Sequence, residues 1–310
     1  KETEHHQTNH ILSLSRVEQT KYVWMDRFTM KNLELFHSPN QNAITLIDVL
    51  DQTQSAMGSR MLRRWLSLPL KNTEEINQRH EIVDRLINED YISDKFIEQF
   101  KIIGDLERLI SKVATLRINP RECGVLKDAL LALDTVKGIC NNSSYKIFKK
   151  IASNIDTCNS LRRKIEKELS DNPPAFIHKG NVIKEGVSKQ LDDLRLMQKS
   201  AKEFLQSLLE REIKNTGINS LKISFNNVFG YYLEVRNKYK DHVPEQWIRK
   251  QTLVNAERYI TEELKEYESK ILNAEERISV LENQLYADLI QYISKYIKPI
   301  QINANLISKL

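Results

Sequence analysis

Helical periodicity dominates the chain. From residue 42 to about residue 179 apolar side chains return every three or four positions, and the run stops at Pro69 and at the Pro173-Pro174 pair. The pattern predicts helices over residues 73–87, 96–117, 120–136 and 144–168, which together form a multi-helix domain. Ahead of them, residues 21–30 alternate well enough to predict one strand.

Two unusually long helices are predicted near the end of the chain, over residues 188–214 and 262–298. Neither range contains Gly or Pro. At 1.5 Å per residue they would be rods of roughly 40 to 50 Å. In the second, apolar residues step alternately by three and four, a period of 3.5 that is typical of a helix packed along another helix. We therefore expect an antiparallel pair.

A short β segment separates these two helices. Apolar and polar residues alternate from Leu221 to Arg236, and the turn formers Asn226 and Asn227 interrupt the alternation. This predicts a hairpin, followed by a looser strand over residues 249–255 and a helix that Thr261 caps. The expected fold is mainly α: a multi-helix core, two long antiparallel helices, and a small antiparallel β domain inserted at their tip.

Composition narrows the class of protein. With 8 Gly and 7 Pro in 310 residues, the chain has little material for a turn-rich β fold. Three cysteines without a C-x-x-C pair indicate reduced thiols in a cytosolic protein. No apolar run reaches the roughly 18 residues of a membrane span. The chain starts at Lys1 without Met, which suggests a piece of a longer protein, and the early histidines (His5, His6, His10) read as a polar leader in preference to metal ligands.

Positive charge gathers in the β segment. Residues 214–260 hold eight Lys or Arg and four Asp or Glu, a net +4 out of +5 for the chain, with 7 of its 23 aromatic residues. A basic, polar sheet suits a phosphate backbone, which Lys and Arg neutralise without reading bases. A second interpretation is equally open at this point: the aromatics form the core of the segment and the charges its solvated face.

No catalytic constellation is visible in the sequence. It has no phosphate-binding glycine loop of either common type, no H-E-x-x-H and no G-x-S-x-G. The acidic pairs Glu74-Glu75 and Glu262-Glu263 stand at expected helix starts, where the helix dipole explains them. His80 and His178 are single histidines in the sequence, and we expect each to be a surface or packing residue and not a general base. We expect a non-enzyme with no catalytic residue and no metal site in this segment.

Five motifs resemble the MutS mismatch-recognition ATPases, in that family's order. They are TMKNLEL (29–35), MGSRMLRRWL with a following Pro-Leu (57–70), GDLER (104–108), NSLK to FGYYLEV (219–235), and QTLVNAERY with ELKEYE (251–268). The resemblance covers about residues 21–290. It implies a helical core, a pair of lever helices and a clamp domain that closes on duplex DNA without reading its sequence.

The resemblance also divides the chain and assigns contacts. It implies the end of a connector region and the start of the core (1–40), a helical core domain (41–187), an outgoing lever helix (188–213), a β clamp domain (214–261), and a returning lever helix with the end of the fragment (262–310). Phosphate contacts are expected from eight polar residues of the clamp. These are Lys222, Asn226, Asn227, Lys238, Lys250, Gln251, Asn255 and Arg258.

Departures from the family pattern limit what this chain should do alone. The family's N-terminal mismatch-reading domain with its F-x-E motif is missing, and Phe96-Ile97-Glu98 falls inside a predicted helix, so we read it as coincidence. The ATPase domain is missing too. We therefore expect no cofactor in this segment. For the longer protein we expect ATP and Mg²⁺, a homodimer, a MutL-type partner, and a cytoplasmic location at the bacterial nucleoid.

Two other hypotheses remain open on the sequence. The long helices could form a coiled-coil structural arm that holds a protein partner without binding DNA, and an exposed apolar stripe would favour this. An enzyme with an unrecognised site is the weakest hypothesis, and a polar cluster in a deep pocket of the helical domain would revive it.

Overall fold

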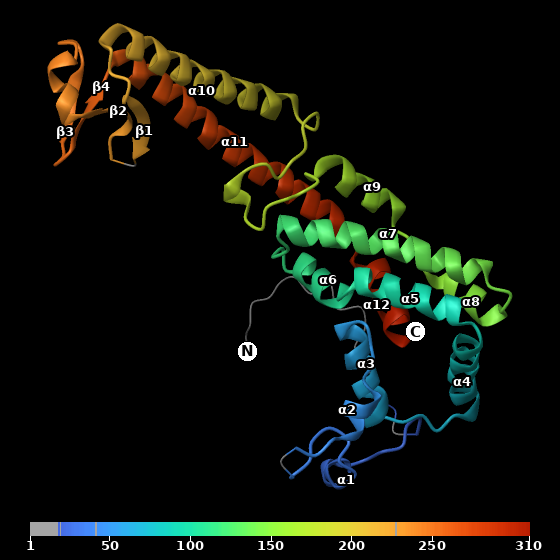
Figure 1. Ribbon diagram of the computed structural model, residues 1–310. Helices are drawn as coiled ribbons and strands as arrows, with labels where there is room; N and C mark the ends of the chain where they lie inside the picture. Colours follow the sequence, from blue (N-terminus) through green and yellow to red (C-terminus); the bar gives the residue numbers. More distant parts are fainter. Residues whose placement is uncertain (1–17, 19, 41, 227) are drawn as a thin grey trace, which may run out of the picture. The chain divides into compact units, whose positions relative to one another are not determined.

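The computed structural model describes residues 18, 20–40, 42–226 and 228–310. It is mainly helical and contains a small antiparallel sheet, as the sequence predicted, and this sheet has four strands (Figure 1). The chain divides into two compact units, one made of residues up to Phe176 together with Tyr286–Leu310, the other of Ile177–Leu285. The five domain boundaries drawn from the sequence stay predictions.

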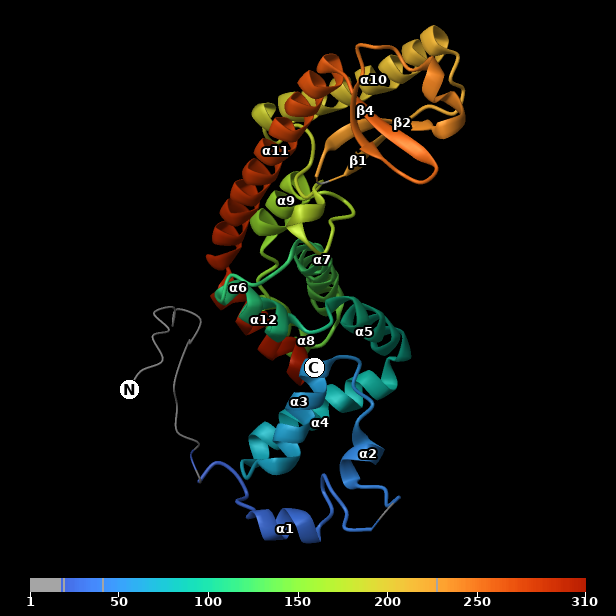
Figure 2. The same ribbon diagram turned by 90° about the vertical axis from the view of Figure 1, so that its left-hand side faces the viewer.

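The first unit is built around one long helix, α7, which buries one face. Leu126, Leu130 and Leu133 recur on it at helical spacing and are fully buried, and α5, α8 and α9 pack against it (Figure 2). A capping box between Asn119 and Glu122 begins the helix. The helices of this unit are α1 (Arg27–Asn32), α2 (Leu46–Leu50), α3 (Ala56–Ser67), α4 (Thr73–Asn88), α5 (Asp90–Ile103), α6 (Leu106–Ala114), α7 (Pro120–Asn142), α8 (Lys146–Asn154), α9 (Asn159–Glu168) and α12 (Ile297–Lys309).

Local capping overrides periodicity at two places in this unit. The single helix predicted over residues 96–117 is wrong, because Gly104 takes a left-handed φ of 61° and ends α5. Asp105 then caps α6 by accepting a hydrogen bond from the Arg108 backbone N–H at 3.1 Å. The helix predicted over 144–168 is likewise divided, with Cys158 at φ 47° before α9.

The strand predicted over residues 21–30 is also wrong. Only Tyr22 makes a β contact, an isolated antiparallel bridge to Leu70. The Asp26 carboxylate accepts a hydrogen bond from the Thr29 backbone N–H at 2.7 Å and starts helix α1. A good N-cap therefore outweighs a weak alternation of apolar and polar residues.

The second unit pairs α10 (Lys189–Thr216) with the first part of α11 (Glu262–Ser294). Contacts between them run in opposite directions along the two helices, which makes the pair antiparallel (Figure 1). These contacts join Arg211 to Glu263, Phe204 to Tyr267, and Arg195 to Glu282. The second helix is shorter than predicted, because α11 ends at Ser294 and not at residue 298.

The sheet lies between these two helices in the sequence and has the strand order β1-β2-β4-β3. The predicted hairpin is confirmed, but the looser strand is in fact a second hairpin whose last strand, β4, the sequence did not reveal. The strands are β1 (Lys222–Asn226), β2 (Gly230–Arg236), β3 (Ile248–Thr252) and β4 (Ala256–Ile260), with the short 3₁₀ helices η1 (Ile177–Lys179) and η2 (Asn237–His242) in the same unit.

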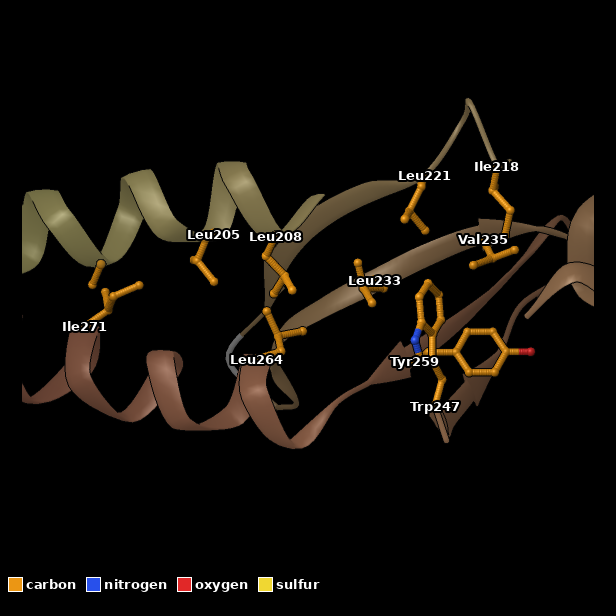
Figure 3. Packing of buried hydrophobic residues seen from close by; sticks show 11 residues of the cluster. Leu205, Leu208, Ile218, Leu221, Leu233, Val235, Trp247, Tyr259, Leu264 and Ile271 are labelled. Atoms are coloured by element: carbon orange, nitrogen blue, oxygen red, sulfur yellow. The ribbon is translucent and has the colours of Figure 1, made fainter. Parts of the chain in front are cut away.

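One face of the sheet packs on the helix pair (Figure 3). Leu233 and Val235 of β2 are fully buried in a cluster that α10 and α11 complete. The other members of this face come from β4, from the loop before β1 and from Trp247, ahead of β3. They belong to one cluster with Leu205, Leu208, Leu264 and Ile271 of the helices, of which Leu208 and Leu264 lie on the side toward Leu233.

Candidate nucleic-acid interface

A row of polar side chains crosses all four strands on the face opposite the helix pair. Lys222 pairs in register with Glu234, Glu234 with Arg258, and Arg258 with Gln251. Side chains alternate between the two faces of a strand, so this row lies opposite Leu233 and its neighbours in the buried cluster. Three of the eight predicted contact residues are thereby brought into one line.

Arg258 is held firmly inside this row. Its guanidinium carbon lies 4.4 Å from the centre of the Tyr232 ring, and its Nη1 donates to Gln251 Oε1 at 2.8 Å. Its Nε lies 3.5 Å from Glu234 Oε2, and only 21% of the side chain is exposed. Arg258 and Gln251 therefore hydrogen-bond to each other, which orients both side chains. The Arg258 guanidinium is less mobile than that of a solvated arginine.

Five other cations, of the sheet and of η2, have no carboxylate partner among the described residues. All five are exposed. Lys238 has one other contact, in which its Nζ lies 4.5 Å from the centre of the Tyr239 ring. By contrast Arg249 lies 3.4 Å from Glu257. A cation without a carboxylate can meet a phosphate without first breaking an ion pair. The five are Lys222, Arg236, Lys238, Lys240 and Lys250.

The predicted asparagines lie at the turns. Oδ1 of Asn226 accepts hydrogen bonds from the backbone N–H groups of Val228 and Phe229, at 3.0 and 2.7 Å. This leaves its amide nitrogen as the group that could meet a phosphate. Asn255 has an exposed side chain, and its carbonyl oxygen accepts from the Asn237 N–H at 3.2 Å. Asn227 lies outside the described residues.

Lys250 borders a hollow of about 460 Å³ together with Asn226, Gly230 and Glu268. Lys250 stands where the register between β3 and β4 shifts, which turns it out of the regular alternation. Burial raises the pKa of Glu268 above its ordinary value, although a hydrogen bond from the Tyr231 backbone opposes this. Gly230 adopts φ 73°, and a Cβ there would collide with the Glu268 carboxylate.

Sequence reasoning assembled part of this surface and missed part of it. The structure places Lys222, Gln251 and Arg258 in one row, and it places Lys250 near Asn226. Arg236 and Lys240 were counted in the local charge but not chosen as contacts. Both could have been chosen from the sequence, because Arg236 is a cation at the end of a strand and Lys240 is a cation in the segment that follows it. Asp241 beside Lys240 reduces the net charge at that end.

Other candidate features of the sequence can be placed in the described part of the chain. There, no group of three or more His, Cys, Asp or Glu side chains is placed to hold a metal ion. The tripeptide starting at Phe96 lies within α5, where the Phe96 side chain is buried. No helix of the described residues is both long and apolar enough to cross a membrane.

The fold and this surface define a class of mainly helical proteins. In this class a small antiparallel sheet with exposed cations is inserted in the sequence between two long helices. The chain belongs to the MutS family, because the family model for MutS domain III matches residues 28–310. This confirms the resemblance drawn from the five motifs.

Curated relatives agree with the family match. The chain is 54% identical over 309 residues to a protein of Flavobacterium psychrophilum named DNA mismatch repair protein MutS, and the match covers 100% of this chain. Proteins of the same name from Flavobacterium johnsoniae and Christiangramia forsetii are 53% and 54% identical, again over the whole chain. The chain spans 36% of the length of each of these relatives. The comparisons do not favour a structural arm without a role in DNA repair.

Proposed function

We propose that this chain is the lever and clamp module of a DNA mismatch-repair protein. In this proposal the sheet and η2 form a clamp that grips the backbone of duplex DNA without reading its sequence. Helices α10 and α11 are the levers that carry the clamp and couple its closure to a nucleotide-dependent step elsewhere in the longer protein. The names of the relatives support a role in mismatch repair.

One observation carries the DNA-binding part of the proposal: the five exposed cations without a carboxylate partner. Each Lys or Arg that neutralises a phosphate releases a condensed counterion, and this supplies affinity that is independent of base sequence. We propose that these five cations contact phosphates. Three of them were chosen from the sequence, and the structure adds Arg236 and Lys240.

The remaining predicted residues have different parts in the proposal. The amide groups of Asn226, Asn227 and Asn255 fix the position of the backbone by hydrogen bonds. Arg258 and Gln251 support the row from within, and the ring of Tyr232 beneath Arg258 keeps the guanidinium in place. Arg258 contacts a phosphate only through the donors that Gln251 and Glu234 leave open.

Fluorescence anisotropy of a labelled duplex tests the proposal. The chain is titrated at several salt concentrations against a perfectly paired duplex and against one with a mismatch. We expect equal affinity for both, with log K falling linearly as log salt rises. The Lys238→Gln/Lys240→Gln variant should lower the slope by about 2. The control variant Lys199→Gln changes an exposed cation on α10 and should leave it unchanged. Absence of binding at low salt would contradict the proposal.

The activity of the longer protein is a wider proposal that follows from family membership. We propose an ATPase that uses ATP and Mg²⁺, acts as a homodimer around the duplex, works with a MutL-type partner and resides in the bacterial cytoplasm at the nucleoid. No residue of this chain is assigned to the nucleotide. A clamp without its mate gives up the avidity of encirclement, so the chain alone should bind DNA weakly.

A further inference from the structure

The two residues at the tip of the loop between β3 and β4, Val254 and Asn255, are exposed. The Val254 side chain is 91% exposed, so it holds the loop against nothing, and the side chain of Asn255 is exposed as well. A backbone hydrogen bond from the Leu253 N–H to the Ala256 carbonyl oxygen, at 2.8 Å, closes the loop. A loop whose tip is not packed tends to move unless another element holds it.

Asn237, at the start of η2, holds this loop from outside it. Its side-chain Nδ2 donates a hydrogen bond to the Val254 carbonyl oxygen at 2.8 Å, and its backbone N–H donates to the Asn255 carbonyl oxygen at 3.2 Å. These two carbonyls belong to the two planar peptide groups that flank the Cα of Asn255. Because both peptide groups are fixed, the direction in which the Asn255 side chain leaves the backbone is fixed as well.

The Asn255 side chain lies at the end of the sheet where two of the five cations without carboxylate partners are found. Arg236 pairs in register with Ala256, the residue after Asn255, and an alanine has no side-chain group that could engage the guanidinium. Strand alternation places Arg236 on the face of the polar row. Lys238 is the second residue of η2. This end of the sheet therefore offers one stretch of phosphate backbone a guanidinium, an ammonium and an amide.

We propose that Asn237 is a positioning residue for the DNA backbone, which holds the loop so that the Asn255 amide meets a phosphate beside those that Arg236 and Lys238 contact. This role rests on the proposed function of the clamp. Asn237 acts through Asn255 and carries no charge, so it neutralises no phosphate. It contributes preorganisation, because a loop that is already fixed need not be ordered when DNA binds.

Fluorescence anisotropy of a labelled duplex titrated with the whole chain tests this role by a double-mutant cycle. Asn237→Ala should weaken binding about three- to ten-fold, because the loop must then be ordered on binding. In an Asn255→Ala background the same substitution should have no further effect, whereas a general loss of structure would weaken binding in both backgrounds.

The salt dependence and a control variant separate this role from that of a cation. The salt slope of binding should be the same for Asn237→Ala and the wild type, whereas Arg236→Gln should lower it by about 1. The control Asn215→Ala changes an exposed asparagine of α10 and should bind DNA as the wild type does.

Hydrogen exchange of the free chain gives a second measurement that needs no DNA. The Leu253 amide should exchange several-fold faster in Asn237→Ala than in the wild type, at unchanged global stability. Equal DNA affinity of Asn237→Ala and the wild type, an equal loss in the Asn255→Ala background, or unchanged exchange at Leu253 would each overturn the role of Asn237 and leave the proposed function standing. Absence of DNA binding by the wild type would overturn the proposed function, and the role of Asn237 with it.

Discussion

Arg60 and Asp105 form a two-pronged ion pair, with Nη1 3.0 Å from Oδ2 and Nη2 2.8 Å from Oδ1. The same guanidinium reaches Glu107 Oε2, with Nη2 2.5 Å away. Arg60 belongs to MGSRMLRRWL and both carboxylates to GDLER, so two motifs 45 residues apart meet through one side chain. Asp105 also caps α6, so the contact ties the start of one helix to the side of α3.

Replacing Arg60 with Gln should destabilise the chain by about 1 kcal/mol at pH 7, since the pair is bidentate but half exposed. The arginine lowers the pKa of Asp105. A carboxylate with a lowered folded pKa stabilises the folded state above its unfolded pKa of about 4, and this is lost as pH falls through the folded value. Urea unfolding at pH 7 and in acid should therefore show the variant's deficit shrinking as pH falls.

Arg121→Gln is the control for this prediction, because Arg121 is an exposed cation without a carboxylate partner among the described residues. It should have the stability of the wild type at both pH values. A deficit for Arg60→Gln that stays constant into acid would show that the loss comes from packing and not from the ion pair.

Much of the fold could be predicted from the sequence because its signals are local. Alternation around Leu233 and the Asn226 turn located the first hairpin, and a regular period located the long helices. Strand β4 escaped because its two polar residues, Glu257 and Arg258, are adjacent and break the alternation, and Glu257 is buried although it is charged. The partners of Arg258 depend on strand register, which no local pattern shows.

Gly230→Ala should destabilise the sheet more than Gly217→Ala. Both glycines have positive φ, 73° and 70°, so each substitution carries a backbone cost of about 1 kcal/mol. A Cβ at Gly217 meets open space, whereas one at Gly230 collides with Glu268. Moving Glu268 sacrifices its hydrogen bond from the Tyr231 backbone, a further loss of about 1 kcal/mol. Chemical denaturation of both variants measures the difference, and in a Glu268→Ala background the two costs should become equal.

Arg258 and Lys250 should respond differently to the loss of their charges. Arg258→Gln removes the contact with Tyr232 and the hydrogen bond to Gln251, so it should lower stability by about 1–2 kcal/mol. Lys250→Gln should leave stability unchanged and reduce the salt slope of DNA binding by about 1. Denaturation and anisotropy on both variants check the separation. An unaltered slope for Lys250→Gln would remove that residue from the proposed contacts.

The three thiols should be inert in the folded chain. Burial raises the pKa of Cys140 to about 11 and those of Cys123 and Cys158 to about 12, so almost no thiolate exists at pH 8. A colorimetric disulfide reagent should titrate no thiol in buffer and three in denaturant. Rapid reaction of one thiol without denaturant would show that its helix opens locally.

The central claim is that the cations without carboxylate partners hold the DNA backbone. Lysine acetylation followed by mass spectrometry, with and without duplex DNA at low salt, measures this directly. We expect DNA to protect Lys222, Lys238, Lys240 and Lys250 several-fold, while Lys199 on α10 reacts equally in both samples. Protection should disappear at high salt. Unchanged reactivity of these four lysines under conditions where the duplex is bound would contradict the account and place the DNA elsewhere on the chain.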